Sequence, residues 1–167
     1  MEYSIKLYHG STTEVKEPLA NVGRKELDFG PGFYLTKDKT QAENWAKTLA
    51  GRKKGAQAIL NTYDFDLTVF EKENYRKRVF TEYNIDWLDF IADSRKGKSP
   101  WAGLDWIEGG IANDSVISTV DAYVDGFITA EQALDKLVNE ELRHQVCISR
   151  QEIIDKYMVF VSSEVLL

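Results

Sequence analysis

Two short segments of the chain combine polar rings with glycines. His9 is followed directly by Gly10 and Ser11. Tyr34 comes two residues after the block Gly30-Pro31-Gly32. Glycine lets main chain approach a ligand closely, and the two rings supply nitrogen and hydroxyl groups for hydrogen bonds. Together these residue types are suited to holding a planar, charged ligand.

The elements expected around these segments place them at the ends of strands. Apolar and polar residues alternate over residues 3–7, so a strand should end close to His9. The glycine block breaks the backbone before a second, short strand over residues 33–35. Apolar residues then recur at helical spacing over residues 40–49, which predicts an amphipathic helix.

The remainder of the chain predicts alternating strands and helices. We expect strands over residues 56–65, 144–148 and 158–161, and helices over residues 86–92, 115–123 and 151–157. Thr129 and Gln132 form a capping box that should begin another helix, running to Leu137. Residues 108–114 are expected to form a glycine loop ahead of the next helix. No repeat or linker separates these elements, so residues 1–167 should fold as one α+β domain.

Composition excludes several classes of protein. No apolar run approaches the ~20 residues that cross a bilayer, and the N-terminus lacks the apolar centre of a signal peptide. A cytoplasmic protein, or an effector delivered without a classical signal, is therefore expected. The single cysteine, Cys147, excludes an internal disulfide, and no metal site is expected because CxxC and HExxH motifs are absent from the sequence. The net charge of -6 disfavours a broad electrostatic grip on nucleic acid.

The two opening segments resemble the signature of ADP-ribosyltransferases of the diphtheria-toxin and poly(ADP-ribose)-polymerase branch. That signature is a histidine, a tyrosine and a glutamate, and some bacterial members carry Asp or Gln in the third place. Residues 30–35 followed by residues 41–46 are similar to the glycine, tyrosine and helix block of the branch, with Trp45 eleven residues after Tyr34. The chain also resembles an uncharacterised bacterial domain family of this superfamily, through its Tyr-His-Gly-Ser opening, its Asp-Phe-Gly block and an Ala-Asn-Asp segment. The resemblance implies a split, mostly antiparallel sheet with flanking helices around an NAD cleft.

The resemblance also implies roles for individual residues. His9 would hydrogen-bond a ribose hydroxyl of NAD, and the Gly10 main chain would hold the nicotinamide carboxamide. Tyr34 and Trp45 would enclose the cationic nicotinamide ring. Their spacing alone equally fits two ordinary core aromatics on a strand and an amphipathic helix.

Three further residues are expected at NAD. Ser11 and Gly32 belong to the two motif segments. Arg24 lies between those segments, in a stretch that could close over the pyrophosphate or simply present surface charge.

On the late strand, Gln145 stands where the family has its glutamate. That glutamate bonds the 2′-hydroxyl of the nicotinamide ribose and stabilises the positive charge that grows as the glycosidic bond breaks. An amide keeps the positioning hydrogen bond but brings no negative charge. Glu140 and Glu141 are alternative carboxylates, although their place at a helix end suits solvated residues. Arg143 occupies the position where arginine-modifying members carry Glu or Gln, which disfavours arginine as the acceptor.

The expected activity is transfer of ADP-ribose from NAD, as co-substrate, to a macromolecular acceptor, with release of nicotinamide. The expected catalytic residues are His9, Tyr34 and Gln145. The acceptor is a protein or a nucleic acid, and the resemblance further implies a bacterial toxin or effector with a neutralising partner protein. Two rival functions stay open, namely a module that binds NAD or ADP-ribose without turnover and an interaction protein without a ligand. A tRNA 2′-phosphotransferase, built on the same fold, is disfavoured by the acidic balance.

Overall fold

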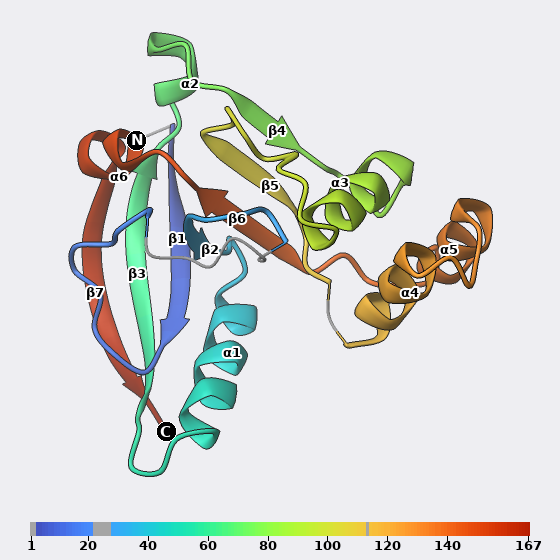
Figure 1. Ribbon diagram of the computed structural model, residues 1–167. Coiled ribbons are helices and arrows are strands. Elements are labelled where there is room, and N and C mark those ends of the chain that lie inside the picture. Colours follow the sequence, from blue (N-terminus) through green and yellow to red (C-terminus); the bar gives the residue numbers. More distant parts are fainter. Residues whose placement is uncertain (1–2, 22–27, 113) are drawn as a thin grey trace.

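The chain folds into two β-sheets flanked by helices (Figure 1). The computed structural model describes residues 3–21, 28–112 and 114–167. One sheet has the strand order β1-β3-β7 and the other the order β2-β6-β5-β4. Strands pair antiparallel throughout, except that β4 and β5 are parallel. The expected α+β class and the mostly antiparallel pairing are confirmed.

The elements follow one another from β1 at the N-terminus to β7 at the C-terminus. The strands are β1 Ser4–Ser11, β2 Phe33–Leu35, β3 Ala58–Asp66, β4 Lys77–Val79, β5 Trp106–Gly110, β6 His144–Ile148 and β7 Met158–Leu166. The helices are α1 Lys39–Gly51, α2 Val69–Lys72, α3 Ile85–Arg95, α4 Asp114–Val124, α5 Ala130–Leu137 and α6 Gln151–Tyr157.

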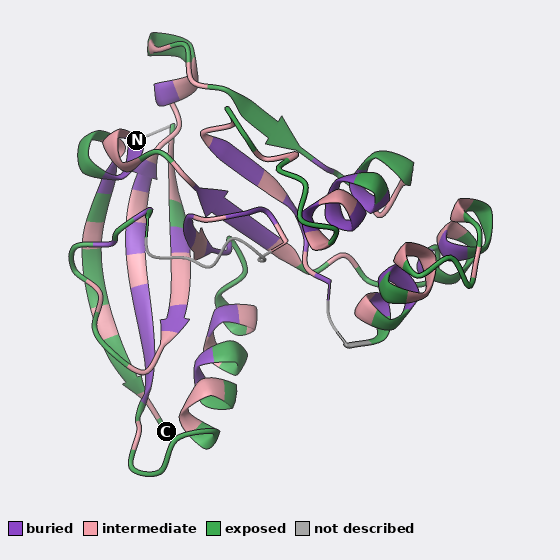
Figure 2. Cartoon of the chain, viewed as in Figure 1, coloured by how far each residue is buried: buried purple, intermediate pink, exposed green. Residues whose placement is uncertain are grey.

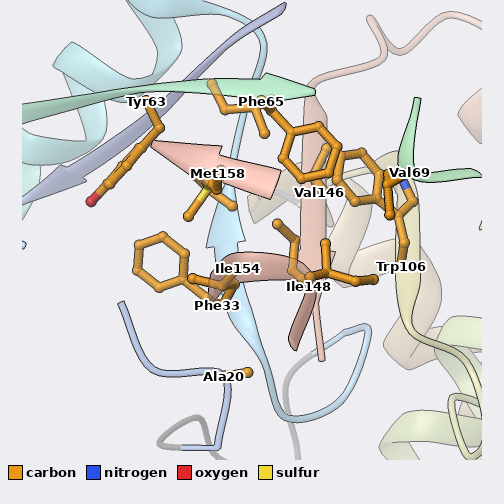
Figure 3. Packing of buried hydrophobic residues seen from close by; sticks show 13 residues of the cluster. Ala20, Phe33, Tyr63, Phe65, Val69, Trp106, Val146, Ile148, Ile154 and Met158 are labelled. Atoms are coloured by element: carbon orange, nitrogen blue, oxygen red, sulfur yellow. The ribbon is translucent and has the colours of Figure 1, made fainter. Parts of the chain in front are cut away.

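Two hydrophobic cores hold these elements together. The first fills the space between the two sheets, where Phe33 packs on Tyr63 and Trp106 packs on Phe65 (Figure 3). The second joins the opposite face of the β2-β6-β5-β4 sheet to α3, α4 and α5. Buried positions therefore alternate along β6 between the two cores, with Val146 in the first and Cys147 in the second. Figure 2 shows the corresponding pattern, in which β3 and β6 are largely buried and the outer strand β7 is largely exposed.

Three expectations about local structure need correction. Residues 108–110 belong to strand β5 and do not open a glycine loop. Glycine is needed there because a Cβ at Gly109 would lie 3.0 Å from the Phe80 side chain, and one at Gly110 would overlap the Tyr83 ring. The irregular stretch before α3 contains the short strand β4, and the last strand extends well beyond residue 161 to Leu166.

The expected helix starts are confirmed where a polar side chain caps them. Thr129 and Gln132 form the reciprocal capping box at the start of α5. Asp38 caps α1 by accepting from the Gln41 N–H at 3.1 Å. In the described part of the chain, no helix is both long and apolar enough to cross a bilayer.

Candidate functional site

Among the described residues, one isolated backbone bridge joins the two sheets, which split apart beyond it. Tyr8 of β1 exchanges two hydrogen bonds with Thr36, at 2.8 and 2.9 Å. In a continuous antiparallel pair, the next such exchange would join Gly10 to Tyr34. Instead, the Tyr34 carbonyl accepts a hydrogen bond from the ring of His9. The sheet therefore opens between Gly10 on one strand and Tyr34 on the other.

The split leaves main-chain groups of Gly10 facing away from β3. The regular register of β1 against β3 points the N–H and C=O of Gly10 to the same edge as those of Tyr8. No backbone hydrogen bond from this edge of Gly10 to any described residue is formed outside the β1–β3 ladder. A donor and an acceptor therefore lie side by side at the split.

His9 is held at this split by its Nδ1 atom. The Nδ1–H donates to the Tyr34 carbonyl at 2.7 Å, since a carbonyl only accepts, and the ring packs on Phe33 with 4.4 Å between centroids. Burial lowers the pKa of His9, although its hydrogen bond to Tyr34 acts in the opposite direction. The neutral ring carries its free lone pair on Nε2, and no described residue hydrogen-bonds that atom. His9 thus offers an acceptor of fixed orientation.

Tyr34 lies on the other face of β2, towards the second core. Its hydroxyl donates to the Gly30 carbonyl and accepts from the Phe29 N–H at 3.2 Å. Burial raises the pKa of Tyr34 well above its ordinary value, so the phenol stays neutral. The hydroxyl therefore fixes the glycine block that precedes β2.

Gln145 shares a face of the sheet with Tyr34. Tyr34 pairs with Cys147 across β2 and β6, and Gln145 precedes Cys147 by two residues, so all three side chains project to the same side. Gln145 is only 8% exposed. The side chains of Tyr34 and Gln145 therefore project from the same face of the sheet. The His9 ring contacts the Tyr34 carbonyl from the opposite face.

The remaining predicted ligand-binding residues have varied surroundings. Trp45 lies half exposed on α1 and carries the Arg52 guanidinium 5.3 Å above its ring, with no ring contact to Tyr34. Ser11 ends β1 and accepts from the Thr13 N–H at 3.2 Å. Gly32 has a packing role, because a Cβ there would overlap the Cys147 sulfur. Arg24 lies outside the described residues.

Two hollows lie under the segment that joins β1 to β2. One has a volume of about 570 Å³ and is bordered by residues 16–21 together with side chains of β3, α6 and β7. The other has a volume of about 390 Å³, shares Ala20 and Asn21 with the first, and extends to Phe29 and Trp101. Neither hollow is lined by a predicted catalytic residue. These two hollows therefore do not coincide with the predicted NAD contacts.

A known family model matches most of the chain. A family model described as "Protein of unknown function (DUF3990)" matches residues 5–160. The chain belongs to this family. No curated protein and no solved structure matches the chain. The family match includes all the predicted site residues and ends within β7.

Two polar residues near the site, Asp28 and Arg95, were not predicted from the sequence. Asp28 accepts from the Ala112 N–H at 3.3 Å and lies 3.6 Å from the Arg95 guanidinium. Asp28 stands in the Asp-Phe-Gly block that carried the resemblance, but Arg95 ends a helix far along the chain. No local pattern links two such positions, so the pair required the fold.

A second polar group, the Glu108 cluster, consists of Glu108, Lys37, His144 and Trp106. The Glu108 carboxylate is bound by Lys37 Nζ at 2.7 Å, His144 Nε2 at 2.9 Å and Trp106 Nε1 at 3.1 Å. Burial alone would raise the pKa of Glu108, but the bonds from His144 and Lys37 hold it at about 2. The cluster ties the start of α1 to β5 and β6, and therefore fixes the helix beside the split.

Replacing Glu108 with Gln is expected to lower the free energy of unfolding at pH 7 by about 2–3 kcal/mol. The folded pKa is below the unfolded value, so the stabilisation is complete above pH 4.5 and is lost as the pH falls towards 2. Urea unfolding at pH 7, 4.5 and 2.5 should therefore show a weaker pH dependence for Glu108→Gln than for the wild type. The exposed residue Glu164, changed to Gln, is the control and should follow the wild type. Equal pH dependence of Glu108→Gln and wild type would contradict the assignment.

Proposed function

We propose that the protein is an NAD-dependent ADP-ribosyltransferase, which moves ADP-ribose from NAD to a macromolecular acceptor and releases nicotinamide. The observation that carries this proposal is the split of the sheet beyond the Tyr8–Thr36 bridge. There the N–H and C=O of Gly10 form a donor and acceptor pair that matches a primary carboxamide, which has one acceptor oxygen and a donor NH₂ group. The family resemblance of the surrounding motifs supports the same assignment.

In this proposal His9 binds the ribose that is attached to the nicotinamide. Its Nδ1 is occupied by Tyr34, so its Nε2 is left to accept a hydrogen bond from a ribose hydroxyl. The lowered pKa favours the neutral ring that this role needs. One hydroxyl bond in a partly buried site orients the ribose relative to the bond that breaks.

In this proposal Trp45 and Tyr34 contact the nicotinamide ring. Trp45 already holds a cation, the Arg52 guanidinium, over its ring, which indicates a face open to positive charge. In this proposal the cationic nicotinamide ring replaces Arg52 there. Contacts of this kind contribute about 0.5–2 kcal/mol each, depending on how far water is excluded.

The proposed reaction breaks the bond between C1′ of the ribose and the ring nitrogen of nicotinamide. The electron pair of that bond leaves with nicotinamide, which becomes neutral, and a lone pair of the acceptor forms the new bond at C1′. The proton of the acceptor passes to solvent. Positive charge therefore moves onto the sugar in the transition state, close to the residue at position 145.

A second candidate is a module that binds NAD or ADP-ribose without turning it over. The observation in its favour is Gln145, because an amide brings no negative charge to the sugar. Both candidates predict NAD binding, and only the first predicts nicotinamide release. The proposal also includes a protein or nucleic acid as the acceptor, a neutralising partner protein, and a role as a toxin or effector.

The test is nicotinamide release by purified protein, alone and with bacterial lysate, beside thermal unfolding with and without NAD. NAD at ~100 times its dissociation constant should add ~2.7 kcal/mol to the free energy of unfolding. Release that increases with lysate, with mass added to a lysate macromolecule, supports the transferase. NAD stabilisation without release supports the binding module. The absence of both stabilisation and release would refute NAD binding altogether.

A further inference from the structure

A buried polar group lies behind β2, on the face that Tyr34 and Gln145 share. We call Asp28, Arg95 and Gln145 the Asp28 cluster. The side chains of Asp28 and Arg95 are 17% and 25% exposed, and Arg95 Nη2 lies 3.6 Å from Asp28 Oδ1. The other carboxylate oxygen accepts from the Ala112 N–H at 3.3 Å. A carboxylate therefore reaches the site from the segment just before the glycine block.

Gln145 is the member of this cluster that has an unsatisfied hydrogen-bond donor. Its Nε2 atom is buried and has no hydrogen-bond partner among the described residues. Gln145 pairs with Gly109 of β5, three residues before the Ala112 N–H that binds Asp28, and its amide acts to lower the pKa of the Asp28 carboxyl. A buried amide N–H without a partner is rare and costly, so an acceptor beside it would stabilise the site.

The charged and titratable groups around Asp28 come from several elements. Arg95 of α3 lies beside it, and Tyr34 of β2 and Tyr83, ahead of α3, are near enough to feel its charge. Burial raises the pKa of Asp28, while Arg95, the Ala112 N–H and the Gln145 amide act to lower it. Arg95 is shared with Asp121, 3.3 Å away, so its charge does not serve Asp28 alone.

We propose that Asp28 is a positioning residue for Gln145 and the source of the negative charge that a glutamate would otherwise bring. Its carboxylate receives the Gln145 N–H, so the amide oxygen turns towards the ribose 2′-hydroxyl. The charge of Asp28 polarises the amide and stabilises the positive sugar through it. This inference rests on the proposed function.

The pairing explains why the chain carries Gln at position 145. A glutamate there would place two carboxylates together in a buried site, and like charges so close cannot both ionise at ordinary pH. One carboxylate and one amide satisfy each other instead. Exchanging the two groups should therefore preserve the arrangement, with the carboxylate now on β6.

The test compares Asp28→Asn, Gln145→Glu and the double variant that exchanges the two groups. Wild-type activity should fall at acid pH, because protonation removes the negative charge of Asp28. Asp28→Asn should lower kcat for nicotinamide release by 10- to 100-fold, leave KM within threefold, and remove this acid loss. Gln145→Glu alone should move that acid loss to higher pH. The exchanged variant should recover at least tenfold in kcat over Asp28→Asn. Unchanged kcat and pH profile in Asp28→Asn, or no recovery in the exchange, would overturn the proposal.

Asp105 supplies a matched control. Its carboxylate also accepts from a main-chain N–H, that of Arg76 at 2.8 Å, and lies near an arginine, Arg150 at 3.8 Å. Asp105→Asn should lower the melting temperature but leave kcat and the pH profile unchanged. A change in pH profile as large as that of Asp28→Asn would show that losing any buried carboxylate has this effect, and would overturn the proposal.

Melting temperatures separate this inference from the proposed function. If the two groups pair, the exchanged variant should melt closer to the wild type than the two single changes predict together. Wild-type protein that binds NAD without releasing nicotinamide would refute the transferase and the catalytic part of this inference. The melting temperatures would still decide whether Asp28 and Gln145 pair, and additive shifts would refute the pairing.

Discussion

Replacing His9 with alanine is expected to lower kcat/KM for nicotinamide release by at least about 100-fold. The change removes the Nε2 acceptor, which we assign to a ribose hydroxyl, and groups that fix charge and position at a reacting centre contribute about 10²–10³ in rate. It also removes the Nδ1 bond to Tyr34 and the packing on Phe33, so a modest loss of stability should accompany it. Activity should therefore be measured well below the melting temperature of the variant.

His9→Asn separates the two roles of the ring. An asparagine amide N–H can take the place of Nδ1–H and keep the bond to the Tyr34 carbonyl, but nothing in asparagine reaches the position of Nε2. This variant should fold like the wild type and be as inactive as His9→Ala. His144→Asn is the control at the only other histidine. Lys37 and Trp106 still bind Glu108 in this variant, so α1 stays in place and nicotinamide release should stay within threefold of the wild type. Full activity in His9→Asn would show that His9 serves only to hold Tyr34.

Local signals in the sequence were enough to predict most helices and strands. The capping box at Thr129 and the apolar alternation of β1 and β6 depend only on neighbouring residues, and both are present in the structure. Strand β4 was missed because Lys77–Val79 is exposed and has no apolar alternation. It is a strand only because β5 offers it a parallel edge, and pairing between distant segments leaves no local pattern.

The candidate site, too, could be predicted from the sequence only in part. The residue types of the motifs could be identified from the sequence, and the structure places His9 against Tyr34. The split itself could not be predicted, because it depends on which strand lies beside β1 and where that pairing stops. Asp28 and Arg95 also required the fold, since a turn and the end of a distant helix meet only once the second core has formed.

Gly10 shows how one residue can satisfy two requirements. The sequence suggested that glycine is needed there so that main chain can approach NAD. The structure gives a second reason, because α1 crosses β1 at this point and the space for a Cβ is taken by the Ala42 carbonyl, with the Ala46 nitrogen 2.9 Å away. Close packing of α1 on β1 therefore requires glycine whether or not a ligand binds.

Gly10→Ala is accordingly expected to lower the free energy of unfolding by more than about 3 kcal/mol. The added methyl group meets main-chain atoms of a helix, which cannot turn aside as a flexible side chain does, so α1 must move away from β1. Gly51→Ala is the matched control in the same helix, where an added Cβ meets nothing within 4 Å. That change should raise stability by about 0.5–1 kcal/mol, because alanine favours the helix over glycine.

Urea unfolding of the wild type, Gly10→Ala and Gly51→Ala gives the three free energies directly. Because α1 carries Trp45 and borders the split, the displaced helix should also weaken NAD binding in Gly10→Ala, even at temperatures where the variant stays folded. Wild-type stability in Gly10→Ala would mean that α1 does not pack on β1 as described. A destabilised variant with unchanged NAD affinity would instead separate the packing role of Gly10 from the ligand role that the resemblance implies.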